Sequence, residues 1–230
     1  MNVVVVGNGI VALQTARRIV RDRPGVRVTL VGPTARAGSA SLAAAAMFNS
    51  FCEVDCGTFD NPFERLKFDF NRAAAPMWPA LLDELRAESG LPVNAGFGTF
   101  LLNNAVSDQL EDENYDAVRD ALVAYAEPFE DVDPRSIPGY KPAPHARAIR
   151  ALSIPREGWV NPMQLIAALD LALAKEPRVR VVDASVETLE ASGDGIATVT
   201  TDSGERVAGD VFVLAPGASF SALVQRSPLS

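Results

Sequence analysis

Four consecutive valines, Val3 to Val6, run directly into the glycine-rich turn Gly7-Asn8-Gly9 near the start of the chain. This apolar run predicts a strand over Asn2–Val6 that is covered on both faces, as in a parallel sheet. Ile10 to Arg23 then repeats apolar residues at helical spacing and stops before Pro24-Gly25. A second apolar run, Val26 to Val31, completes a strand–helix–strand unit, which predicts an α/β, Rossmann-like fold.

The predicted helix has two distinct faces. Its apolar face comprises Ile10, Leu13, Ala16, Ile19 and Val20, and the face expected in solvent carries Arg17, Arg18 and Arg21.

The glycine turn has the spacing of a dinucleotide-binding loop. Gly7 permits the sharp turn out of the strand, Gly9 lets backbone amides approach a pyrophosphate, and Ala12 leaves room for close helix packing. The helix N-terminus adds the positive end of its dipole. The second strand of such a unit usually ends on an acidic residue that binds the ribose, but Gly32 stands there. We therefore expect the ribose hydroxyls to meet backbone groups or the Thr34 hydroxyl.

Arg36 leaves the choice of dinucleotide open. An arginine near the end of the second strand can hold the 2′-phosphate of NADP. The position of Arg36 several residues past the strand favours an ordinary solvated loop arginine instead.

Composition excludes several classes of partner. The net charge is −8 and the sequence pI is about 4.7, which argues against nucleic acid and anionic membranes. No basic segment precedes the first apolar run, so we expect a cytoplasmic protein without a secretory signal. The patch from Leu42 to Phe48 is too short to span a bilayer.

The two cysteines, Cys52 and Cys56, lack further soft ligands nearby, since the single histidine, His145, is far away in sequence. We expect reduced structural thiols, a surface or loop histidine and no metal site.

The remaining helices and strands are predicted from the hydrophobic periodicity and from the proline and glycine residues between the periodic segments. Helices are predicted over Leu66–Ser89, broken near Pro76 and Pro79, over Asp108–Ala126 and over Asn161–Lys175. Strands are predicted over Gly96–Leu102, Ala146–Ile154, Val179–Val182, Val186–Ala191, Ile196–Thr201, Arg206–Val207 and Asp210–Leu214. The proline-rich stretch from Glu127 to Pro162 is expected to connect two lobes.

Several segments, in order, resemble the D-amino-acid oxidase, glycine oxidase and sarcosine oxidase family of FAD-dependent oxidoreductases. They are "GSASLAAAAMF", "APMWPALLDELRAESGLPVNAGFGTFLL", "GWVNPMQLIAAL" and "VETLEASGDGIATVTTDSGERVAGDVFVLAPGASFSALV". The resemblance implies an FAD-binding domain over 1–92 and 146–230, with a parallel sheet and a three-stranded meander. It also implies part of an α+β substrate lobe over 93–145.

The resemblance also implies cofactor contacts. The FAD pyrophosphate would be faced by Gly7, Gly9 and Ala12. The ribityl chain and the isoalloxazine ring would be lined by Ser41, Ala45, Ala46 and Met47. The adenine would be held by the backbone of Val186, and the cofactor would be covered by Ala215 and Gly217. Ala45, Met47 and Val186 would look identical as core residues, and for these three the residues alone favour core. Two departures from the family pattern are Gly32, which weakens adenosine binding, and Ala46, which replaces a usual glycine and crowds or shifts the flavin ring. No catalytic residue is identified.

The implied activity is oxidation of the C–N bond of an amine or an amino or imino acid, by hydride transfer to FAD. Family members run well past the point where this chain stops, which implies that a second polypeptide completes an apolar central strand and the unfinished lobe. A non-catalytic, degenerate flavoprotein subunit is an alternative suggested by Gly32 and Ala46. An NAD(P)-dependent oxidoreductase is a further alternative suggested by Arg36.

Overall fold

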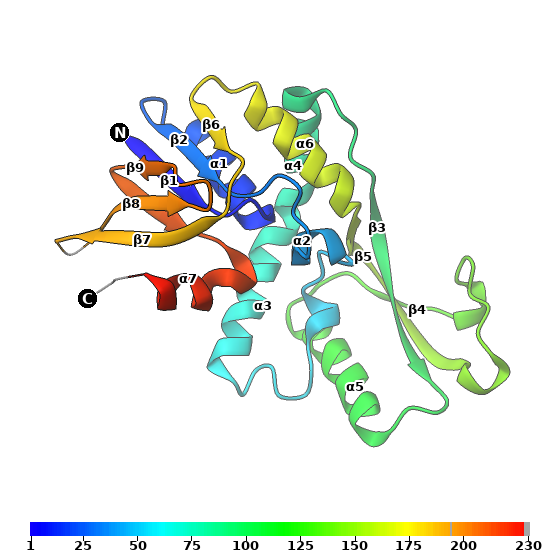
Figure 1. Cartoon of the computed structure of the whole chain (residues 1–230). Helices are drawn as coiled ribbons and strands as arrows, with labels where there is room; N and C mark the ends of the chain where they lie inside the picture. Colours follow the sequence, from blue (N-terminus) through cyan, green and yellow to red (C-terminus); the bar gives the residue numbers. More distant parts are fainter. Residues whose placement is uncertain (194, 228–230) are drawn as a thin grey trace. The chain divides into compact units, whose positions relative to one another are not determined.

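The computed structural model describes residues 1–193 and 195–227, which form two compact units. Of the described residues, unit 1 comprises Met1–Ala44, Glu84–Val93, 162–193 and 195–227, and unit 2 comprises Ala45–Asp83 and Asn94–Asn161. Figure 1 traces the chain through both units in sequence order. The predicted functional division, with the substrate lobe over 93–145, stays a prediction. In the structure, residues 45–83 and 146–161 belong to the same compact unit as most of the segment 93–145.

Unit 1 is built on a four-stranded parallel sheet, as the opening pattern predicts. Its strands are β1 (Asn2–Val6), β2 (Arg27–Val31), β6 (Val179–Val182) and β10 (Val211–Leu214), in the order β10-β1-β2-β6. Helix α1 (Ile10–Asp22) joins β1 to β2 and contacts α6 (Pro162–Ala174). The short helices α2 (Ala40–Ala43), η5 (Gly217–Ser219) and α7 (Phe220–Arg226) also belong to this unit. The predicted strand–helix–strand unit is confirmed.

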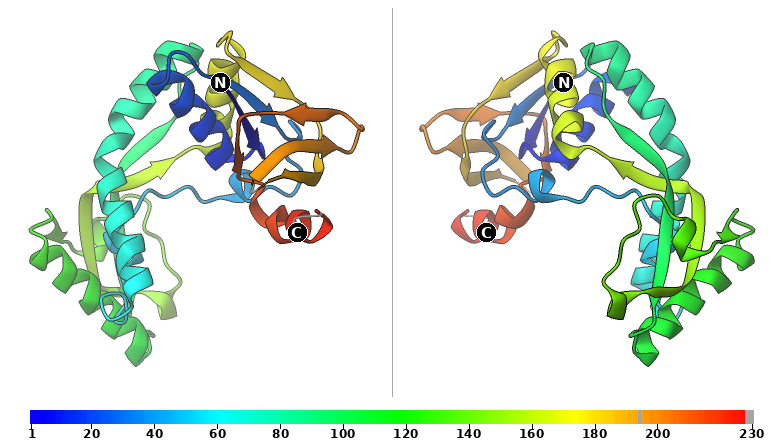
Figure 2. Two further views of the ribbon diagram at one scale, coloured as in Figure 1. Left: turned by 90° about the vertical axis from the view of Figure 1, so that its left-hand side faces the viewer. Right: turned by 90° about the vertical axis from the view of Figure 1, so that its right-hand side faces the viewer.

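A three-stranded antiparallel meander packs on the parallel sheet. It consists of β7 (Val186–Ser192), β8 (Gly195–Thr201) and β9 (Arg206–Ala208). Both views of Figure 2 show its orange strands beside the blue strands of the sheet. Val4, Val6 and Val31 of the sheet join Leu189 and Val199 of the meander in one buried cluster. The predicted meander is therefore confirmed, and apolar burial holds it to the sheet.

Strand β10 forms one edge of the parallel sheet rather than a central position. It pairs with β1, and no strand of the described part of the chain pairs with its other side. Val211 is 44% exposed, although the strand is apolar throughout. A strand of this composition at an open edge is a site to which another strand can add.

The predicted solvent face of α1 is wrong at one position. Arg17 is buried, because its guanidinium pairs with Glu84 (3.0 Å) and Glu88 (2.6 Å) near the end of α4 (Trp78–Ser89). Arg21 also pairs with Glu84. These arginines hold the pKa of the Glu84 carboxyl at about 2, through hydrogen bonds first from Arg21 and then from Arg17. The helical period shows on which face of the helix a charged residue lies. Whether that face is exposed to solvent depends on what packs against it in the tertiary structure.

Unit 2 is an antiparallel sheet with a helix packed on it. The strand order is β3-β5-β4, with β3 (Ala95–Asn104), β5 (Ala148–Val160) and β4 (Glu130–Asp131). Helix α5 (Gln109–Ala124) shares a buried cluster with β5 through Tyr115, Leu122, Leu152 and Ile154. Helix α3 (Pro62–Ala74), capped by the Asn61 side chain, adds Phe68 to the same cluster. The short helices are η1 (Phe51–Glu53), η2 (Ala75–Met77), η3 (Pro134–Ser136) and η4 (Pro144–Ala146).

Two predicted elements of unit 2 differ in length from the structure. The long helix is broken at η2, as Pro76 and Pro79 predict, but it begins at Pro62 rather than Leu66. Strand β5 continues to Val160 instead of ending at Ile154. The register against β3 shifts between Phe97 and Thr99, so the residues around Pro155 bulge out and the proline needs no amide for the ladder. None of the helices in the described residues is long and apolar enough to cross a membrane.

Candidate functional site

The glycine loop of unit 1 is held between two strand ends. Gly7 has φ of +119°, and a Cβ there would lie 2.1 Å from the Ala215 carbonyl oxygen. The Gly7 amide donates to the Val31 carbonyl (2.8 Å), and the Ala215 amide donates to the Val6 carbonyl (2.8 Å). Only glycine satisfies both the backbone angle and the close approach. Gly7 and Ala215, two separately predicted site residues, therefore lie against each other.

Three predicted residues meet at the N-terminus of α1. Gly9 is the N-cap and offers no side chain to the first turn, and Ala12 is fully buried. The Ser41 hydroxyl accepts a hydrogen bond from the Ile10 amide (3.0 Å), and a Cβ on Gly9 would approach that hydroxyl oxygen to 3.2 Å. Small side chains, a helix N-terminus and a hydroxyl group together form a cradle suited to a pyrophosphate.

The absence of a ribose-binding acid at residue 32 has a steric reason. A Cβ on Gly32 would lie 2.8 Å from the Cβ and the amide nitrogen of Asn8, and 2.8 Å from the carbonyl carbon of Gly7. Asn8 is buried, and its side-chain amide donates to the carbonyl of Pro33 (3.3 Å). The asparagine in the glycine loop thus fills the space beside Gly32.

The prediction of a solvated Arg36 is wrong. Arg36 is 8% exposed and has φ of +49°, a backbone conformation that is uncommon outside glycine. Its guanidinium donates to the Asn8 carbonyl, to the Asn8 side-chain oxygen (2.8 Å) and to both oxygens of Asp170 on α6. The ion pair with Asp170 therefore neutralises the buried guanidinium charge within the fold. The NADP alternative loses the residue that suggested it.

Thr34 holds a carboxylate that the sequence analysis does not single out. The Thr34 amide donates to Asp183 Oδ1 (2.7 Å), and its hydroxyl donates to Asp183 Oδ2 (2.9 Å). The hydrogen bond from the Thr34 amide, and to a lesser extent that from its hydroxyl, lowers the pKa of the exposed Asp183 carboxyl. The predicted Thr34 hydroxyl therefore comes with a fixed negative charge. Asp183 directly follows a predicted strand, but the sequence does not tell which strand lies beside it.

The other predicted residues of unit 1 lie at the ends of elements. Val186 begins β7, and its side chain packs against the buried cluster of that unit, in agreement with a core role. Gly217 begins η5 with φ of +61°, and a Cβ added there would meet nothing within 4 Å. Their contacts with a cofactor stay predictions.

Ala45, Ala46 and Met47 belong to unit 2. Ala46 has φ of +53°, and its carbonyl accepts a hydrogen bond from the Val160 amide (3.0 Å). Met47, 46% exposed, forms an isolated bridge with Trp159. The left-handed backbone at Ala46 gives a physical reason for the glycine that the family resemblance predicts at this position.

Replacing Ala46 with glycine is expected to raise the free energy of unfolding by about 1 kcal/mol, because glycine adopts the left-handed region without the Cβ penalty. Urea unfolding followed by circular dichroism measures the change. Ala45→Gly is the matched control, since Ala45 lies outside the left-handed region and its replacement should lower stability. Equal effects of the two substitutions would contradict the proposed strain.

A buried carboxylate that the sequence analysis missed organises the start of unit 2. Glu157 is 2% exposed, and its Oε1 accepts hydrogen bonds from the amides of Ser50 (2.6 Å) and Phe51. Its Oε2 accepts from the Cys52 amide (3.3 Å). Burial, and then the Glu157 charge, raise the pKa of the Cys52 thiol. The position of Glu157 beyond Pro155 hides it from pattern analysis.

The cysteines and the histidine form no site in the described residues. Cys52 and Cys56 are free thiols, and His145 is exposed on η4. Within residues 1–193 and 195–227, no three histidine, cysteine or acidic side chains lie together in a way that could hold a metal ion.

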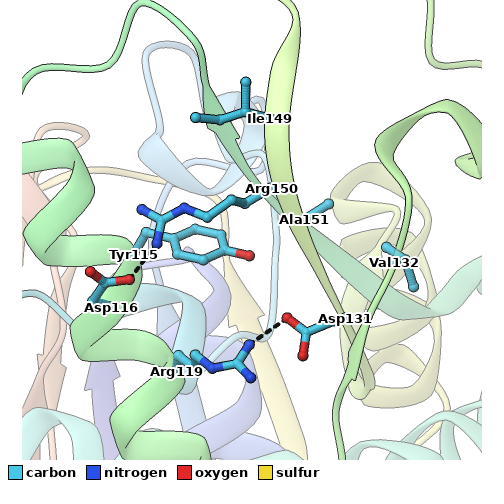
Figure 3. Close-up of a pocket in the computed structure, with 8 residues that line it drawn as sticks. All are labelled: Tyr115, Asp116, Arg119, Asp131, Val132, Ile149, Arg150 and Ala151. Carbon is cyan, nitrogen blue, oxygen red and sulfur yellow. Dashed lines mark hydrogen bonds and ion pairs between the residues drawn. The ribbon is translucent and has the colours of Figure 1, made fainter.

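A pocket of about 450 Å³ lies in unit 2, between α5 and the β4–β5 edge (Figure 3). Arg150 lies across the Tyr115 ring (4.3 Å) and pairs with Asp116 (2.6 Å), while Arg119 pairs with Asp131. The Tyr115 hydroxyl is buried and has no hydrogen-bond partner in the described part of the chain. The pocket contains no predicted site residue, and its cations are already paired, so we assign it no ligand.

Comparison with known families decides the relationship. A family model described as FAD dependent oxidoreductase (DAO) matches residues 2–229. The chain belongs to this family. FAD is the cofactor of the family, which confirms the predicted cofactor and the predicted relationship. A search of curated protein sequences gave no match.

Solved structures of the family share this fold. Glycine oxidase from Geobacillus kaustophilus superposes with a TM-score of 0.77 at 23% identity, over 97% of this chain and 57% of that one. Glycine oxidase from Bacillus cereus gives 0.77 at 19% identity, with the same two coverages. L-Proline dehydrogenase from P. horikoshii gives 0.69 at 18% identity, over 98% of this chain and 55% of that one. The chain thus spans little more than half the length of these proteins.

The residues of unit 1 fit the pyrophosphate of the family cofactor. The Gly7 position leaves no room for a side chain, a Cβ on Gly9 would come within 3.2 Å of the Ser41 hydroxyl oxygen, and the Ile10 amide in the first turn of α1 donates to that hydroxyl. The adenosine end differs from the usual pattern, because Gly32 supplies no carboxylate.

Proposed function

We propose that this chain is part of an FAD-dependent enzyme that oxidises the C–N bond of an amine or an amino or imino acid. Membership of the FAD-dependent oxidoreductase family carries the proposal, together with the glycine-loop cradle. Proteins of the same fold include glycine oxidase, iminodiacetate oxidase and L-amino acid deaminase, which are named for small amino compounds. Their identities of 18 to 23% make substrate class an inference from analogy.

When bound, FAD supplies the two-electron chemistry by accepting a hydride from the carbon that bears the nitrogen. In the proposal, Gly7, Gly9, Ala12 and Ser41 hold the pyrophosphate through backbone amides and one hydroxyl. Thr34 lies toward the adenosine, and the backbone of Val186 lies against the adenine. Ala45, Ala46 and Met47 lie along the ribityl chain and ring, and Ala215 and Gly217 close over the cofactor.

We further propose that additional polypeptide, expected as a second chain, completes the protein. The open outer edge of β10 and the exposed Val211 side chain support this proposal. Native mass spectrometry of the purified protein tests it. A complex containing a second polypeptide is expected, and a stable monomer with the mass of this chain alone, fully active, would refute it. The cytoplasmic location stays a prediction from the sequence.

The activity is tested by the visible absorption spectrum of the protein with its co-purifying partners. Flavin bands that bleach on addition of one member of a panel of small amino acids and secondary amines are expected. Bands that no amine bleaches would argue against this substrate class.

A non-catalytic, degenerate flavoprotein subunit that has lost the cofactor is the second candidate, and Gly32 favours it because the ribose carboxylate is missing from its usual strand. A folded, colourless complex that does not take up added FAD would support this candidate.

A further inference from the structure

The carboxyl end of β2 lies directly beside the carboxyl end of β6. The two strands are parallel, with Val31 opposite Val182, and the Gly32 amide donates to the Val182 carbonyl (3.0 Å). Neighbouring strands lie about 4.8 Å apart. The residue that follows β6, Asp183, therefore leaves the sheet at the same edge and next to the position where the ribose acid is missing.

Asp183 is fixed in place yet open to solvent. The amide and hydroxyl of Thr34, in the loop after β2, each donate to one of its two oxygens, at 2.7 and 2.9 Å. An ionised carboxylate has about four acceptor positions, so about two remain for other donors. The two oxygens make no other hydrogen bond among those described, and the residue is exposed.

The adenosine ribose of a dinucleotide needs such an acceptor. Its hydroxyls are donors that a carboxylate at the end of the second strand normally binds. At Gly32 a side chain would collide with Gly7 and Asn8, so the acceptor has to come from another element.

We propose that Asp183 binds the adenosine ribose hydroxyls of FAD, replacing the acid absent at residue 32, and that Thr34 orients it. This inference rests on the proposed function for the presence of FAD, and it adds the residue that selects ribose. It also removes the main argument for a degenerate cofactor site, since the carboxylate is moved to the neighbouring strand.

A purely structural role for Asp183 makes a different prediction. If the carboxylate only ties the loop after β2 to the end of β6, its replacement will affect every adenine nucleotide equally. If it binds the ribose, the effect will depend on the ribose hydroxyls.

The test uses the full chain, titrated by calorimetry with ADP and with 2′,3′-dideoxy-ADP. We expect the wild-type chain to bind ADP about tenfold or more tightly than the dideoxy analogue, because hydrogen bonds to a charged group are lost. In Asp183→Asn, the side-chain oxygen can still accept a hydrogen bond from the Thr34 amide, and the side-chain NH₂ can donate to the Thr34 hydroxyl oxygen. It should weaken ADP binding by a similar factor and leave binding of the analogue unchanged.

Asp202→Asn is the control, since it removes one exposed negative charge from the turn between β8 and β9. It should leave the binding of both nucleotides as in the wild type. Equal wild-type affinity for the two nucleotides would overturn the proposal, as would an equal loss for both in Asp183→Asn, or no binding of ADP at millimolar concentration. Since no amine or flavin is involved, these outcomes are separate from a failure of the proposed oxidation, which the flavin spectrum reports.

Discussion

Gly32→Ala is expected to weaken FAD binding by roughly 10- to 100-fold, since it displaces the hydrogen-bonding backbone of the cradle. It should also lower the free energy of unfolding by roughly 1–3 kcal/mol. The added Cβ would lie 2.8 Å from backbone atoms of both Gly7 and Asn8. Gly7 cannot retreat on the other side, because the Ala215 carbonyl already touches it. The loop would therefore shift as a whole and carry its amides away from the pyrophosphate.

The experiment compares FAD dissociation constants, from quenching of flavin fluorescence, with urea unfolding curves. Gly25→Ala is the control, because a Cβ at Gly25 meets nothing within 4 Å and its φ lies outside the left-handed region. It should leave the FAD dissociation constant unchanged and raise the free energy of unfolding slightly, by about 0.4–1 kcal/mol. Wild-type FAD affinity in Gly32→Ala would show that the loop does not depend on the close contact.

Glu157→Gln is expected to lower the free energy of unfolding by about 3 kcal/mol, since a buried charge that accepts several amide hydrogen bonds is replaced by a group with one acceptor. The new side-chain NH₂ would face the amides that now donate to Glu157, those of Ser50, Phe51 and Cys52. Urea unfolding measures the loss. Glu130→Gln, on exposed β4, is the control and should change stability by less than about 0.5 kcal/mol.

The same variant has a chemical readout at Cys52. The Glu157 charge contributes to the raised pKa of that thiol, so its removal should lower the pKa and increase the thiolate fraction at alkaline pH. Alkylation of Cys52 by iodoacetamide at pH 8 should become faster in Glu157→Gln than in the wild type, with exposed Cys56 as the internal reference. An unchanged rate together with unchanged stability would contradict the role assigned to Glu157.

The parts of the fold that depend on local pattern could be predicted from the sequence. The valine run, the glycine turn and the helical period gave β1, α1 and β2 within one or two residues, and turn residues gave the meander. Strand order could not be predicted, because no local signal tells that β6 lies beside β2. The importance of Asp183 depends on that order alone. The Rossmann-like fold class is confirmed, whereas the individual cofactor contacts stay predictions.

Burial of charged residues was the other source of error. Arg17 and Arg36 were expected in solvent, and both are buried because carboxylates far away in sequence meet them. Glu157 was missed because a proline beforehand suggested the end of a strand. Whether a charged side chain is buried depends on whether a partner of opposite charge meets it. A partner that is distant in sequence leaves no periodic signal.

The cluster of Asn8, Gly32, Arg36 and Asp170 makes substitutions at these four positions depend on one another. Introducing the usual acid at residue 32 collides with the loop backbone, and removing Arg36 leaves Asp170 and the Asn8 carbonyl without their shared donor. The four residues are in contact, so the effects of replacing them are not expected to add. A single substitution at any of the four positions should therefore cost more stability than the same substitution made together with a compensating change at its partner.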